Sequence, residues 1–268
     1  MNIFEEIGEI FPELDVLSFL LPTTDDELLK KYSSTIDNYN NLKTLPVKFN
    51  EIFASNGWIA TDDLSVPVMK ESIEIYKKEG IGKAEDFLVN EFTEDYFYNN
   101  LRRMCAVWVF EDRKDLIELA YKDHSKERYH ASVPVVLAQI DGIIHDIANQ
   151  SFYELDKKLD IFKIDSAITG LKNELHTIAK KMNKTRNETK NSPLSFPYRN
   201  GIIHGRDLNY SNKYVSTKCF FNLFAIRPWA LFIQQNEMKK RQGAEFIDIP
   251  KLKIGKKLDE KIEKLLKD

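Results

Sequence analysis

Two side chains that suit phosphate chemistry lie five positions apart in the segment Ser195–Asp207, which reads SFPYRNGIIHGRD. Arg199 carries a permanently charged planar fork that matches phosphoryl oxygens, and His204 is of a residue type that titrates near neutral pH and moves protons. On a regular helix this spacing turns the two side chains about 140° apart. Gly201 between them makes a distorted helix easy to form, so the pair could still face one cleft.

The flanking residues predict a short helical turn for this pair. Pro197 pre-sets the backbone for the turn, and Gly205 is placed to end it. The preceding segment, 183–195, is polar, interrupted by proline and rich in Asn, Ser and Thr, which is typical of a mobile loop. A long aromatic helix is expected from about Asn212, and Pro228 should kink or split it.

Two further helices are expected before the loop. The polar run 122–132 marks a boundary, and Ser132 with Pro134 supplies a helix start. The helix that follows carries an apolar stripe at helical period, formed by Val133, Val136, Leu137, Ile140, Ile143, Ile144 and Ile147. The second helix is expected over 164–182, with Ile168, Leu171, Leu175 and Ile178 facing inward.

The chain as a whole is predicted to be all-α, with a helical N-terminal domain followed by a helical bundle. Apolar positions three and four residues apart predict N-terminal helices at 25–32, 46–53, 66–78, 83–90, 94–108 and 113–123. We place a domain of unassigned role at 1–125, the bundle at 126–240 and a C-terminal extension at 241–268. The extension should hold a short extended piece, FIDIPKLKI, and a charged helix.

Composition and charge limit the classes of function. The 268 residues are 43% hydrophobic, enough for one large domain or two small ones. Two cysteines without CxxC spacing suggest neither a disulfide framework nor a structural zinc site. The net charge of −3 argues against a generally basic protein, but residues 170–213 hold nine basic side chains and three acidic ones. An acidic start and the lack of an apolar run of about 18 residues predict a cytoplasmic location and no membrane partner.

A metal-dependent alternative rests on QIDGIIHDIA. Asp141 and His145 lie four residues apart on one helix face, and the doublet His145-Asp146 resembles metal-dependent phosphohydrolases of the HD type. Such a site needs further ligands from other helices, and His124 and His130 are the only histidines upstream. The favoured interpretation of His145 and Asp146 is a polar edge on an amphipathic helix, and no metal ligand or cofactor is assigned.

The candidate pair lies in a pattern that resembles a known superfamily. Arg199-Asn200, three further residues and then His204-Gly205 is similar to the signature of the HEPN superfamily, in which an Arg and a polar residue precede a His. The resemblance extends from the helix at Ser132 to the kinked helix near Ile233. The stretch YHASVPVVLAQIDGII is also similar to the first helix of a HEPN-like group found in bacterial and phage-defence proteins.

This resemblance implies that residues 126–240 form a HEPN-like domain acting as a metal-independent endoribonuclease, toxin-like or in antiviral defence. Arg199 would bind the scissile phosphate and stabilise its developing charge, His204 would move the proton of the attacking 2′-hydroxyl or of the leaving oxygen, and Asn200 would orient the backbone or phosphate. The substrate would be RNA, because the nucleophile is the 2′-hydroxyl. The alternative is a non-catalytic HEPN-fold module for dimerisation or regulation.

The remaining expectations concern support and partners. Asp141 could anchor Arg199 through a bidentate pair. Four cations are expected to give the RNA groove its positive field: Lys184, Arg186, Lys190 and Arg206. A homodimer is expected, with the motifs meeting at the dimer cleft and the aromatic helix 213–226 offering apolar surface for the interface. An antitoxin or regulatory protein is a possible further partner.

Overall fold

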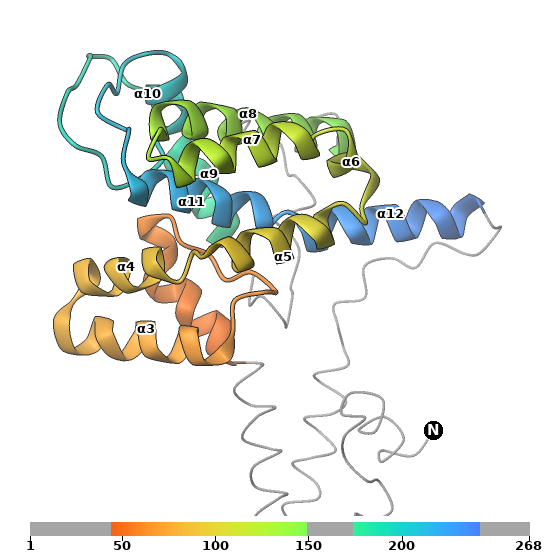
Figure 1. Cartoon of the computed structure of the whole chain (residues 1–268), viewed down its shortest axis with the longest axis horizontal. Coiled ribbons are helices and arrows are strands. Elements are labelled where there is room, and N and C mark those ends of the chain that lie inside the picture. The colour runs from red at the N-terminus through yellow and green to blue at the C-terminus, as the bar shows by residue number, and fades with distance from the viewer. Residues whose placement is uncertain (1–43, 149–173, 242–268) are drawn as a thin grey trace, which may run out of the picture. The chain divides into compact units, whose positions relative to one another are not determined.

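The computed structural model describes residues 44–148 and 174–241, which lie within one compact unit (Figure 1). Helices make up most of these residues, and the predicted all-α class is confirmed. In the described ranges the β-structure is limited to an isolated bridge between Lys190 and Asp207. The predicted helix at 25–32, the first part of the helix at 164–182, and the extended piece and charged helix near the C-terminus lie outside the described residues.

The N-terminal helices follow the predicted apolar periodicity. Residues 44–53 are helical, and then come η2 (Ala54–Asn56), α3 (Val66–Glu79), α4 (Ile81–Asn90), α5 (Glu94–Met104), α6 (Trp108–Glu111) and α7 (Lys114–Ser125). Polar side chains start two of them, because Ser65 accepts a hydrogen bond from the Val68 amide and Thr93 accepts one from the Tyr96 amide. The helix expected over 94–108 ends at Met104, and Trp108 begins the next one.

Helix α8 (Tyr129–Ala148) begins three residues before the predicted start at Ser132. Ser132 is buried inside the helix, where its hydroxyl lies 2.8 Å from that of Ser216 instead of capping the first turn. Pro134 lacks an amide hydrogen and so leaves the carbonyl of His130 without its usual helical donor. The Tyr210 hydroxyl donates to that carbonyl at 3.2 Å, which explains why this helix tolerates an internal proline.

The C-terminal helices are α9 (Glu174–Met182), α10 (Arg199–Ile203), α11 (Lys213–Phe224) and α12 (Arg227–Arg241). Asn212 is the N-cap of α11, and its side chain accepts a hydrogen bond from the Val215 amide at 3.0 Å. Pro228 lies in the first turn of α12, so the predicted division of the aromatic helix is confirmed. None of the helices among the described residues is long and apolar enough to cross a membrane.

Helix α11 is the centre of the described unit. It runs between α4 on one side and α8 on the other (Figure 1), and every residue from Val215 to Phe224 is buried. Phe220 stacks on Phe92 with ring centroids 5.3 Å apart. The expectation that helix 213–226 offers surface for a dimer interface is therefore wrong, because this chain's own helices cover α11.

One apolar core joins the N-terminal helices to α8–α12. Its buried side chains run from Leu45 to Ala230 without division into separate clusters. Helices α7 and α8 pack along each other, so residues on both sides of position 125 share this core. The predicted domain limits at 125 and 240 stay predictions.

Candidate functional site

Helix α10 is a single short helix that carries the candidate motif from end to end. Arg199 is its first residue and His204 follows its last. Gly205 adopts φ +65°, its amide donates to the Ile202 carbonyl at 3.1 Å, and the Arg206 amide donates to the Gly201 carbonyl at 2.7 Å. These two bonds and the left-handed glycine are a Schellman helix end, and the predicted role of Gly205 is confirmed.

The segment after α10 returns against the helix at Gly201. The carboxylate of Asp207 is buried beside this glycine and accepts a hydrogen bond from Arg186 Nε at 2.8 Å. The Arg186 guanidinium also lies 4.0 Å from the centre of the Tyr198 ring. Burial alone would lower the pKa of Arg186, but the hydrogen bond and charge of Asp207 raise it above its usual value. Arg186, which was expected in an RNA groove, thus stabilises the turn after α10 through its ion pair with the buried Asp207.

A buried cation supports the chain just before α10. Lys218 of α11 donates to the Glu85 carboxylate at 2.7 Å and to the Ser195 carbonyl at 2.5 Å, and its own side chain is fully buried. Trp58 Nε1 donates to the same carboxylate at 3.0 Å. Burial lowers the pKa of Lys218, while the charge of Glu85 acts in the opposite direction. The start of the motif segment is in this way fixed to α4 and α11.

The Arg199 guanidinium is oriented from two sides. Its Nη2 lies 3.6 Å from Asp141 Oδ2 of α8, and its Nη1 donates to Asn200 Oδ1 at 2.9 Å. Asn200 Nδ2 in turn donates to the Asn183 carbonyl at 2.8 Å. The structure therefore brings Asp141, Arg199 and Asn200 together, with Asn200 holding the arginine and the loop before α10. About a quarter of the Arg199 side chain remains exposed, which leaves room for an anionic ligand to approach.

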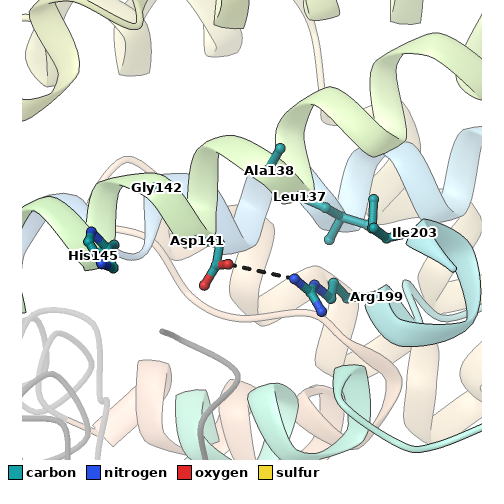
Figure 2. A pocket seen from close by; sticks show the side chains of 7 residues that line it. All are labelled: Leu137, Ala138, Asp141, Gly142, His145, Arg199 and Ile203. Atoms are coloured by element: carbon teal, nitrogen blue, oxygen red, sulfur yellow. Dashed lines mark ion pairs between the residues drawn. The ribbon is translucent and has the colours of Figure 1, made fainter. Parts of the chain in front are cut away.

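A pocket of about 340 Å³ opens beside this guanidinium. Figure 2 shows Asp141 and Arg199 facing each other in it, with His145 one turn further along α8. The lining residues are Leu137, Ala138, Asp141, Gly142, His145, Arg199 and Ile203. His204 is exposed and is not among them. The histidine that shares the pocket with Arg199 is thus His145, and its signal in the sequence was the four-residue spacing from Asp141.

The other expected RNA-binding cations are exposed residues in the segments that precede and follow α10. Lys184, Lys190 and Arg206 are all exposed. The Lys190 amide donates to the Arg206 carbonyl at 2.7 Å, and this short pairing ties the loop before α10 to the segment after it. Lys190 and Arg206 are therefore exposed neighbours on two paired segments.

Two residues of the metal alternative, Asp146 and His124, are engaged elsewhere. Asp146 is paired with Arg113. His124 lies in the core, where its Nδ1 is 2.8 Å from the Ser216 hydroxyl, and burial lowers its pKa to about 4. Within 44–148 and 174–241 there is no group of three His, Cys, Asp or Glu side chains that could hold a metal ion.

No protein-family model, curated protein or solved structure matches this chain. The case for a function therefore depends on the residues and on their geometry.

Proposed function

We propose that this protein is a metal-independent endoribonuclease of the HEPN type, which cleaves RNA through attack by the 2′-hydroxyl. One observation carries the proposal: the two ends of a single five-residue helix present Arg199 and His204, and Asp141 of α8 holds the arginine at the edge of a pocket. At about 1.5 Å per residue the two positions are separated by roughly 7.5 Å along the helix axis.

The chemistry follows from the two side-chain types. The 2′-oxygen attacks phosphorus, the bond from phosphorus to the 5′-oxygen breaks, and one proton leaves the nucleophile while another reaches the leaving oxygen. Arg199 stabilises the negative charge that develops on the phosphoryl oxygens, and its pairing with Asp141 and Asn200 keeps it oriented before the substrate arrives. His204 is exposed at the C-terminal end of α10 and carries out one of the proton transfers.

The assembly and biological setting belong to the same proposal. We place the enzyme in the cytoplasm as a homodimer, with the two copies of α10 near a shared cleft and with an antitoxin or regulatory protein as a further partner. The interface must lie outside α11, since that helix is buried within one chain. Toxin-like activity or antiviral defence is the role that we assign to RNA cleavage.

The test of this function is cleavage of a mixed cellular RNA pool by the full chain and by Arg199→Ala and His204→Ala. Each variant should lose activity by about a hundredfold to ten-thousandfold, with the fold unchanged. The double variant should be little worse than either single one, because the residues act as a unit. Arg102→Ala, at an exposed site on α5, is the matched control. Wild-type protein that binds RNA or dimerises without cleaving it would favour the non-catalytic module.

A further inference from the structure

The pocket beside Arg199 contains a histidine that the proposed reaction does not yet use. His145 is exposed on α8, and its imidazole has no hydrogen-bond or ion-pair partner among the described residues. Two other side chains of α8, Gln139 and Asp146, do have a partner, because the Arg113 guanidinium binds both of them. The neighbouring Asp146 carboxylate is thus bound to Arg113, and the His145 imidazole faces the pocket without an ion pair to it.

The pocket has the polarity expected of a site for one nucleotide. Arg199 and His145 provide groups that bind phosphoryl oxygens, while Leu137, Ala138 and Ile203 provide an apolar wall. Figure 2 shows Asp141 and His145 on the same part of α8. A volume of about 340 Å³ is at the small end of the range for ligand pockets and admits one unpaired nucleotide.

We infer that His145 is a second catalytic residue, which contacts the RNA phosphate held by Arg199 and performs the proton transfer that His204 does not. This inference rests on the proposed function. Cleavage by the 2′-hydroxyl requires one proton to leave the nucleophile and one to reach the 5′-oxygen, and within one chain the histidine that shares the pocket with Arg199 is His145. His145 lies on α8 and His204 directly follows the last residue of α10, so the two imidazoles come from different segments of the fold.

The experiment compares His145→Ala with His130→Ala in two assays, and Arg199→Ala is added to the second. Both histidines are exposed on α8, so alanine preserves the helix in each case, and a shared melting temperature verifies the fold. The first assay measures cleavage of the mixed RNA pool. The second measures equilibrium binding of adenosine 3′-monophosphate, uridine 3′-monophosphate and inorganic phosphate, and it does not depend on turnover.

His145→Ala should reduce cleavage by at least about a hundredfold and weaken binding of the mononucleotides by about tenfold, while His130→Ala changes neither. Cleavage by His145→Ala at the wild-type rate would overturn the inference and leave the proposed function standing. Failure of the wild-type chain to cleave any RNA would instead overturn the proposed function. In that case, mononucleotide binding that depends on His145 and Arg199 would still support the nucleotide pocket, and binding that is indifferent to both would overturn it.

Discussion

The carboxylate of Asp207 occupies the space that a side chain at position 201 would need. A Cβ atom built on Gly201 would lie 1.9 Å from Asp207 Oδ2 and 2.5 Å from Asp207 Cγ. Asp207 cannot move outward without leaving Arg186, because the pair is held at 2.8 Å and the carboxylate is buried. The glycine inside the Arg199–His204 motif is therefore required by packing, and the turn and the candidate site are built from the same contacts.

Gly201→Ala should lower the free energy of unfolding by about 3 kcal/mol and abolish RNA cleavage, because Asp207 must leave its pocket. Urea denaturation of the purified chain measures the first effect. Gly82→Ala is the matched control, since a Cβ at Gly82 meets nothing within 4 Å and that residue lies in helix α4. The control should be as stable as the wild type or slightly more so. Equal stability of the two variants would contradict the packing argument.

Arg186→Ala should destabilise the protein by about 3 kcal/mol, since it leaves the buried Asp207 carboxylate without its cation. Lys184→Ala, two residues away and exposed, should stay within about 0.5 kcal/mol of wild type. Thermal and urea unfolding of both variants check this difference. If Arg186→Ala weakens RNA binding while stability is unchanged, Arg186 is a groove residue after all, as the sequence alone suggests.

Lys218→Met should destabilise the protein by about 3 kcal/mol, because it strands Glu85 beside Trp58 in the core. Replacing Glu85 by Met as well removes the uncompensated charge and should recover part of the loss. Lys77→Met provides the control, since its pair with Glu74 is exposed and should contribute little. A Lys218→Met variant as stable as this control would show that the ionic contact does not hold the motif segment to the core.

The buried His124 should make stability fall in mild acid. Burial lowers its folded-state pKa to about 4, so the unfolded chain binds the proton more tightly between that value and about pH 6.5. The stability that the neutral His124 contributes is fully present above about pH 6.5 and is lost as the pH falls toward 4. The free energy of unfolding should already be about 2 kcal/mol lower at pH 5. His124→Gln should flatten the dependence of unfolding free energy on pH between 7 and 5. An unchanged slope would show that His124 is not the titrating group.

Local signals in the sequence predicted most of the helices and the C-terminal end of the candidate turn, whereas Pro197 lies just before α10 and not in its first turn. Apolar periodicity marked α3, α4 and α7, and Gly205 and Pro228 act through backbone restrictions that need no distant partner. The start of α8 was missed because Ser132 is bonded to Ser216, far along the chain. Such pairings are set by tertiary packing and leave no local pattern.

Long-range partners also explain what was missed at the site. Arg186 resembles a loop cation until Asp207 is placed beside it, and α11 resembles an amphipathic surface helix because it contains Lys218 and Asn222. Both polar groups have buried partners on other segments, including Glu85 and the Gly57 carbonyl. The position of His145 in the Arg199 pocket depends on how α10 packs against α8, which the spacing from Asp141 alone did not determine.

The most direct measurement of the central claim is the chemistry of the RNA ends left by the wild-type chain in EDTA. Attack by the internal 2′-hydroxyl leaves 2′,3′-cyclic phosphate and 5′-hydroxyl ends, and Arg199 and His204 supply charge and proton transfer without a metal ion. We predict these ends at undiminished yield in EDTA, and their loss in Arg199→Ala and in His204→Ala. Cleavage that stops in EDTA, returns with a divalent ion and leaves 5′-phosphate ends, or that proceeds equally in both variants, would contradict the account.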